Sequence, residues 1–153
     1  MAAKVILTAL RLALGALFVY AGAVKAGAAP EFARDIQRYA ISPWPEATVL
    51  LAVYLPWLEM VSGTALLLRR WYLGALVAIA GLMLIFTGAL TSAWVRGLDI
   101  ECGCFGRRKE AIRTNFPALL ARDVALLAAA GVLLVAEWRR SRAIASPSST
   151  PSL

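Results

Sequence analysis

The sequence predicts an all-α integral membrane protein: a four-helix bundle with a short interfacial helix between the first two spans. Hydrophobic residues make up 61% of its 153 residues, against about 45–50% in soluble domains. Charged residues make up only 16%, where about 25% is usual. Four separate apolar stretches each have the roughly 20 residues that a helix needs to cross a bilayer. These observations argue against an ordinary soluble enzyme and against a disordered chain.

The four expected spans cover residues 5–24, 47–68, 71–95 and 117–138, within one membrane domain over residues 1–140. Each is expected to be a helix, because backbone polar groups in lipid must be satisfied within the segment. Residues 141–153 are rich in serine and proline, and we expect them to form a disordered C-terminal tail.

Residues 30–40, between the first two spans, have the pattern of a short amphipathic helix. Phe32, Ile36 and Tyr39 recur at i, i+4 and i+7, which places them on one face. This helix is expected to lie in the membrane interface or to cap the bundle. Arg69 and Arg70 alone separate the second and third spans, so those spans should form a tight antiparallel hairpin.

Composition also limits the chemistry. The chain has no histidine and only two cysteines, which excludes histidine-ligated haem, Ser-His-Asp triads, and zinc or iron–sulfur sites built from four cysteines of one chain. Neither a haem nor a metal centre is predicted. The net charge of +7 is explained by basic residues flanking membrane spans, so nucleic-acid binding is not expected.

The link between the third and fourth spans contains the distinctive motif Cys102-Gly103-Cys104-Phe105-Gly106. A chain bent at Gly103 can bring two thiols close enough for a disulfide. A small strained ring is more readily reduced, as reversible redox chemistry requires. Redox exchange is the preferred interpretation, and a static bridge or a soft-metal site completed by other ligands stays open.

The first span carries a second pattern, in which every member lies on one helix face. Its small residues would allow a neighbouring helix to approach closely, so a packing face explains the glycines well. The pattern consists of Arg11, Gly15, Phe18, Gly22 and Lys25.

Charged residues inside the spans are costly and therefore informative. Arg11 lies about 9 Å in from Val5 and Glu59 about 14 Å in from Leu68, on the same side of the membrane. We therefore expect them to form an intramembrane charge pair that holds the bundle together; a role toward a proton or a quinone is the alternative. Arg122 and Asp123 lie on the opposite side, with Lys25 and the cysteine loop. A cation there could stabilise a thiolate or a reduced quinone.

Together these features resemble the MauE/DoxX-like family of bacterial redox-associated membrane proteins, most closely its methylamine-utilisation branch. The resemblance covers roughly residues 5–138, and the Cys-Gly-Cys-Phe-Gly loop is its most specific part. It implies a four-helix membrane bundle that forms disulfides in periplasmic proteins alongside a thioredoxin-fold partner. DoxX-type relatives are linked to thiosulfate:quinone oxidation.

We therefore expect a thiol–disulfide oxidoreductase that uses Cys102 and Cys104 and exchanges electrons with quinone and a periplasmic client dithiol or thioredoxin-like protein. The alternatives are a non-enzymatic assembly factor with a static bridge and a sulfur-compound:quinone oxidoreductase subunit. Lys/Arg counts on the two sides, six against eight, do not decide the orientation. Charge density near the span ends and the resemblance favour a bacterial inner-membrane protein with cytoplasmic termini and a periplasmic cysteine loop. The supporting residues expected around the cysteines are Gly103, Phe105, Gly106, Arg122, Asp123 and Lys25.

Overall fold

The computed structural model describes residues 2–38, 45–96 and 116–145, and these residues form five helices. Four of the helices are long and apolar enough to cross a membrane. The predicted all-α membrane bundle with a short helix after the first span is therefore confirmed. The helices are α1 (Ala2–Gly27), α2 (Ala29–Arg38), α3 (Pro45–Leu68), α4 (Tyr72–Val95) and α5 (Phe116–Ala145).

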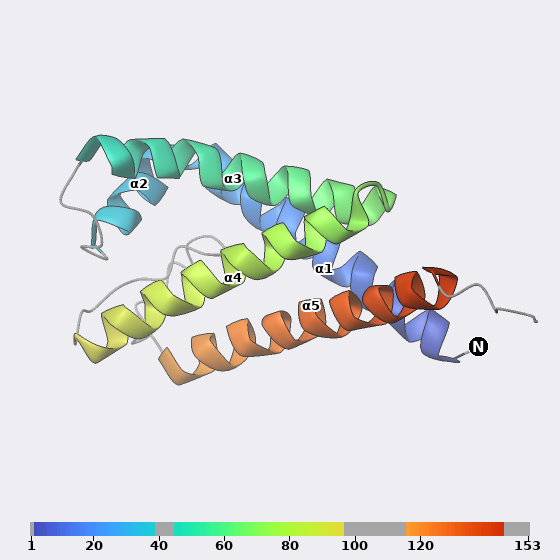
Figure 1. Ribbon diagram of the computed structural model, residues 1–153. Helices are drawn as coiled ribbons and strands as arrows, with labels where there is room; N and C mark the ends of the chain where they lie inside the picture. The colour runs from blue at the N-terminus through green and yellow to red at the C-terminus, as the bar shows by residue number, and fades with distance from the viewer. Residues whose placement is uncertain (1, 39–44, 97–115, 146–153) are drawn as a thin grey trace, which may run out of the picture.

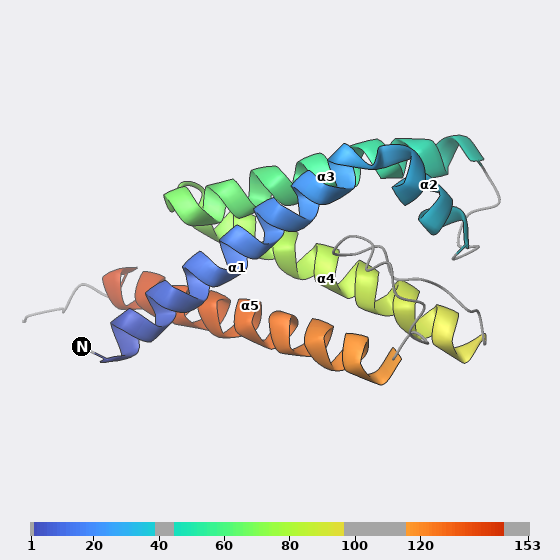
Figure 2. The ribbon, with the colours of Figure 1, turned by 180° about the vertical axis from the view of Figure 1, so that it is seen from behind.

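Consecutive helices from α3 to α5 pack against one another, and α1 contacts both α3 and α5. Helices α3 and α4 form a hairpin, and α4 packs against α5 (Figure 1). Helix α1 crosses the bundle diagonally, from the end of α5 to the first half of α3, as the view from behind shows (Figure 2). The short helix α2 packs on α3 and buries Phe32. The buried core draws on all four long helices, through Leu14, Phe18, Leu66, Leu76, Ile79 and Leu133.

The antiparallel packing of α1 on α3 depends on glycines. A methyl group at Gly22 would lie 2.6 Å from the carbonyl oxygen of Pro56, and one at Gly63 would lie 2.8 Å from the carbonyl oxygen of Gly15. Backbone atoms cannot move aside as the end of a side chain can, so any larger residue would push the helices apart. The sequence prediction of a close-packing glycine face on the first span is confirmed.

The turn between α3 and α4 ends α3 with an unusual residue. The amide of Arg70 donates to the carbonyl of Ala65, and that of Arg69 to the carbonyl of Leu66. This is the hydrogen-bond pattern of a Schellman motif, whose left-handed position is usually glycine. Here Arg69 occupies it with φ 57°, so the chain keeps a guanidinium at a position where a side chain costs conformational energy.

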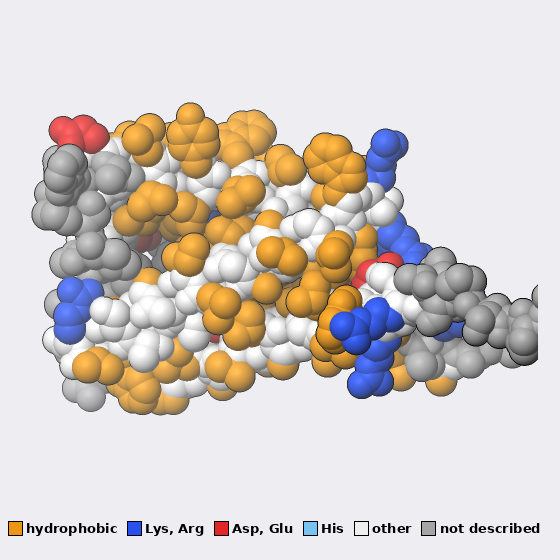
Figure 3. Space-filling model, viewed as in Figure 1, with side chains coloured by type: hydrophobic (Ala, Val, Ile, Leu, Met, Phe, Trp, Pro, Cys, Tyr) orange, Lys and Arg blue, Asp and Glu red, His pale blue; other side chains and the backbone are white. Residues whose placement is uncertain are grey.

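Large apolar side chains cover the outside of the long helices (Figure 3). Tyr54, Val61 and Ile85 are each more than 60% exposed. Such surfaces are unfavourable in water and suit lipid tails. The chain is therefore a multi-pass membrane protein in contact with the bilayer.

Helix α5 extends further than the sequence predicted. Residues 141–145, assigned above to a disordered tail, are helical. The guanidinium of Arg142 lies 3.8 Å from the centre of the Trp138 ring, and Ser141 Oγ donates to the carbonyl of Glu137. The contact of Arg142 with Trp138 ties the added residues to the preceding turn. The remaining tail, residues 146–153, lies outside the described residues.

Candidate functional site: a buried cluster of charges

Two charged side chains from different helices meet inside the bundle. The Lys25 ammonium of α1 donates to Glu59 Oε1 of α3 at 2.5 Å. Both side chains are almost completely buried, at 3% and 2% exposure. Isolated charges at this depth would be very costly, so each residue is tolerable because the other is present.

The helices and two aromatic rings position Lys25. It lies in the last turn of α1, where the helix dipole favours a cation. Its ammonium lies 4.4 Å from the centre of the Phe86 ring and 5.4 Å from that of Phe32. Both distances are within the range of cation–π attraction. The ammonium is therefore held by a carboxylate and two rings, contributed by α3, α4 and α2.

A second pair lies on α5. The Arg122 guanidinium donates to Asp123 Oδ1 through Nε at 3.1 Å and through Nη2 at 2.9 Å. Asp123 is buried at 4% side-chain exposure, whereas Arg122 is one-third exposed. Both donors meet the same oxygen, and hydrogen bonds between ionised groups are roughly twice as strong as neutral ones.

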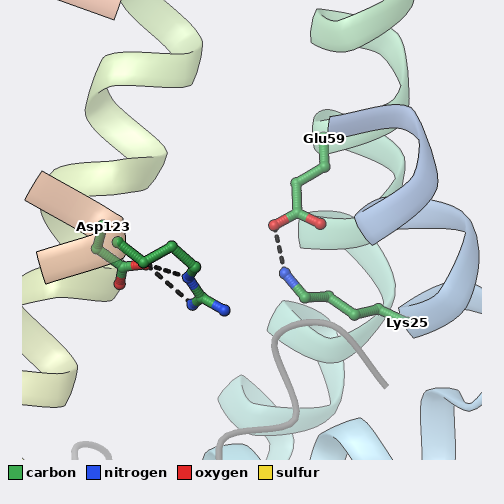
Figure 4. A network of polar contacts seen from close by, with 4 residues as sticks. Lys25, Glu59 and Asp123 are labelled. Carbon is green, nitrogen blue, oxygen red and sulfur yellow. Dashed lines mark hydrogen bonds and ion pairs between the residues drawn. The ribbon is translucent and has the colours of Figure 1, made fainter. Parts of the chain in front are cut away.

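Both pairs line one small cavity. Figure 4 shows Asp123 facing the Lys25–Glu59 pair across the space between their helices. The cavity has a volume of about 20 Å³, enough for about one water molecule. Glu59 Oε2 is buried and has no hydrogen-bond partner among the described residues. Four ionisable groups thus line one small cavity, together with the described residues Phe18, Ala21, Met83 and Phe86.

The expected pairing of Arg11 with Glu59 is wrong, and the helix register explains why. Gly15 packs against Gly63, and Arg11 and Glu59 each come four residues before these glycines on antiparallel helices. They are therefore displaced in opposite directions, by about 12 Å in total at 1.5 Å per residue. Arg11 lines a different cavity, at the end of the bundle that holds the N-terminus of α1.

The structure brings together three of the predicted supporting residues, Lys25, Arg122 and Asp123, and adds Glu59 to them. The motif Cys102-Gly103-Cys104-Phe105-Gly106 lies outside the described residues. Its segment, residues 97–115, joins the end of α4 to the start of α5. Asp123 comes seven residues after that start, about 10 Å along the helix.

Sequence reasoning missed the Lys25–Glu59 pair and the rings of Phe86 and Phe32 around it. A signal for the pair was present in the spacing. Gly15 and Gly22 are seven residues apart, as are Pro56 and Gly63, and these two pairs meet in the α1–α3 contact. Lys25 comes three residues after Gly22, and Glu59 comes three residues after Pro56. Residues three apart lie on the same helix face, so both side chains lie on the contacting faces. No comparable spacing indicates the position of Phe86.

Comparison with known proteins finds one family. The family model described as methylamine utilisation protein MauE matches residues 3–136. The methylamine utilization protein MauE of Paracoccus denitrificans is 35% identical over 101 residues, which cover 65% of this chain and 54% of the relative. The chain thus spans about half the length of the curated relative that it matches. None of the solved structures matches it. The match over most of the chain shows that this protein belongs to the MauE family.

Proposed function

We propose that this protein exchanges disulfides through Cys102 and Cys104 with an extracytoplasmic thioredoxin-fold partner or client, and that it serves methylamine utilisation, as the name of its Paracoccus relative indicates. The carrying observation is the buried cluster of Lys25, Glu59, Arg122 and Asp123. A purely structural anchor has little use for four ionisable side chains in one cavity, because such groups are costly in a membrane and typically mark functional pathways.

The exchange requires two bond changes. A partner thiolate attacks one sulfur of the Cys102–Cys104 disulfide, so that this bond breaks and a mixed disulfide forms. The second partner thiolate then attacks the mixed disulfide. The partner leaves oxidised, and the two cysteines retain two electrons and two protons. The same bonds change in reverse when the partner is reduced.

The charge cluster suits the removal of protons from the two cysteines. Each turnover leaves two protons on the cysteines, and reoxidation must remove them. Arg122 is the most exposed of the charged residues that line the cavity, and α5 begins where the cysteine segment ends. We propose that Arg122 favours the thiolate form during reoxidation, since a nearby cation lowers the cost of a thiolate.

Reoxidation needs a two-electron acceptor, and we propose a quinone. The cavity of about 20 Å³ is far smaller than the several hundred Å³ typical of organic ligand sites. The charge cluster therefore does not fit a quinone ring.

We also propose an inner-membrane location with both termini in the cytoplasm and the cysteine segment in the periplasm. Exposed Lys and Arg side chains gather at the end of the bundle where α5 ends (Figure 3). The counts of Lys and Arg on the two sides do not decide the orientation, but their density close to the span ends favours the cytoplasm for that end. The periplasm is also the compartment in which disulfides persist.

The test follows thiol reoxidation in membranes. Membranes are reduced, freed of reductant, and sampled over time with a maleimide that adds mass to each thiol. The parent protein should reoxidise, and Arg122→Ala should do so several-fold more slowly. The rates are compared at a temperature where the variant is folded, because the loss of the partner of buried Asp123 should lower its unfolding temperature. Arg122→Lys should restore most of the rate, and Arg34→Ala, which changes an exposed cation of α2, should have no effect.

Unchanged reoxidation in Arg122→Ala would remove the role given to Arg122. The wider proposal fails if a Cys102→Ser, Cys104→Ser double variant complements fully in a host that requires the protein. That outcome would favour a non-enzymatic assembly factor.

A further inference from the structure

A second cavity lies at the opposite end of the bundle, among the start of α1, the α3–α4 turn and the end of α5. Its volume is about 480 Å³, more than twenty times that of the cavity between the charge pairs. Among the described residues that line it, Glu137 is the one acid, and Arg140 lies 3.9 Å from it. The cations that line the cavity are Lys4, Arg11, Arg69, Arg139 and Arg140.

Two of these cations are placed at a cost to the fold. Arg11 Nε is buried and has no hydrogen-bond partner among the described residues. An unsatisfied buried donor on a charged group is unfavourable. Arg69 occupies the left-handed position that ends α3, where glycine would be less strained. A bound anion would accept hydrogen bonds from both guanidinium groups. It would thereby offset the unsatisfied donor of Arg11 and the backbone strain at Arg69.

The cavity is long enough to begin at the headgroup layer and to reach the edge of the hydrocarbon core. It extends along α1 from Lys4 to Arg11, about 10 Å at 1.5 Å per residue. The polar layer on each side of the hydrocarbon core is thinner, about 5–7 Å. Trp71 and Trp138, both more than half exposed, lie near this end of α4 and α5, as aromatic residues do at membrane interfaces.

We infer that this cavity binds a phosphate group, carried by an anionic phospholipid or free in solution. Guanidinium groups match phosphate oxygens in geometry as well as charge. Basic pockets between spanning helices are known sites for phosphate-bearing headgroups. The inference is independent of the cysteine chemistry, because the cavity lies at the other end of the bundle.

The experiment measures lipid retention. The full chain is purified and reconstituted in nanodiscs containing equal amounts of phosphatidylglycerol and phosphatidylcholine. Native mass spectrometry then gives the ratio of the two lipids that stay bound. We expect the parent protein to retain phosphatidylglycerol preferentially, and Arg11→Gln to lower that preference about fivefold, the effect of about one cation near a membrane surface.

The variant Arg69→Gly separates an effect on lipid binding from an effect on stability. It removes a cation but relaxes the turn, so its unfolding temperature in neutral detergent should not fall, while phosphatidylglycerol retention should fall about fivefold. The matched control is Arg70→Gln, which removes the neighbouring cation of the same turn. Arg70 does not line this cavity, so retention should stay at the parental level.

A second arm identifies the source of the phosphate. Inorganic phosphate is titrated into protein in a neutral detergent that contains no phosphate group, with chloride at equal ionic strength as the control. Phosphatidylglycerol preference without stabilisation by phosphate identifies a lipid headgroup. Stabilisation by phosphate that Arg11→Gln abolishes identifies free phosphate. The inference is overturned if neither is seen, or if Arg70→Gln loses as much as Arg69→Gly, since that would show only general surface attraction.

Discussion

At the end of the bundle where α5 begins, Lys25 is paired with Glu59 and Arg122 with Asp123, inside a cavity of about 20 Å³. At the end where α5 finishes, the described residues that line a cavity of about 480 Å³ include five cations and one carboxylate. The first arrangement is balanced in charge among the described residues, and three of its four charged side chains are buried. The second has an excess of positive charge and room for a small anionic group.

This difference shows two ways in which a small membrane protein accommodates cations. A buried pair requires its partner from the same chain, so removing one member leaves an uncompensated charge. A cation at the membrane surface can instead be neutralised by phosphate groups or solvent. Variants at the paired end should therefore affect stability, whereas variants at the open end should affect binding.

The largest effect is expected at Glu59. A Glu59→Leu change leaves the Lys25 ammonium buried without a counter-charge, and should cost about 3–5 kcal/mol. The double variant Lys25→Met, Glu59→Leu should recover most of this loss, because no charge remains. Thermal unfolding in neutral detergent measures both, with Glu46→Gln, an exposed acid on the same helix, as the control. A double variant as unstable as the single one would contradict the pairing.

The next largest effect concerns the register that brings this pair together. A Gly22→Ala methyl would lie 2.6 Å from the Pro56 carbonyl oxygen, and overpacking of this kind costs about 1–3 kcal/mol. Gly88→Ala is the matched control, since its methyl would meet nothing within 4 Å and alanine favours the helix. Chemical unfolding should separate the two variants. Equal stability would show that the α1–α3 contact is looser than described.

A smaller effect is expected at Phe86. Its ring centre lies 4.4 Å from the Lys25 ammonium, and Phe86→Leu should lose a cation–π contribution of about 0.5–2 kcal/mol. A double-mutant cycle with Lys25→Met isolates this contribution from the loss of packing. If Phe86→Leu costs as much when Lys25 is absent, the ring acts only by packing.

The smallest effect on stability is expected for Arg11→Met in neutral detergent. Arg11 Nε donates to no described residue, and methionine preserves much of the apolar stem. The change should therefore cost less than the roughly 1.5 kcal/mol of a hydrogen bond to a charged group. The stability of the variant is measured by unfolding with and without added phosphatidylglycerol. Only the stabilisation that the lipid gives to the parent protein should be lost. A large loss in neutral detergent would place Arg11 in an internal pair after all.

Much of the fold could be predicted from the sequence, because length and hydropathy define spanning helices almost independently of tertiary contacts. The glycines at 15 and 22 indicated a packing face. The partner of Glu59 could not be found from distances to the span ends, because α1 begins at Ala2 and its register on α3 is set by glycine contacts. The extra turns of α5 depend on local contacts of Trp138 and Glu137 that hydropathy does not detect.

The central claim, that Cys102 and Cys104 form a reducible pair on the periplasmic side, is tested most directly by labelling intact cells with a membrane-impermeant maleimide, before and after a mild reductant. We predict that both cysteines label only after reduction. Labelling that requires broken membranes would place the segment in the cytoplasm, and labelling without reduction would show free thiols in place of a disulfide. Either result would contradict the proposed exchange.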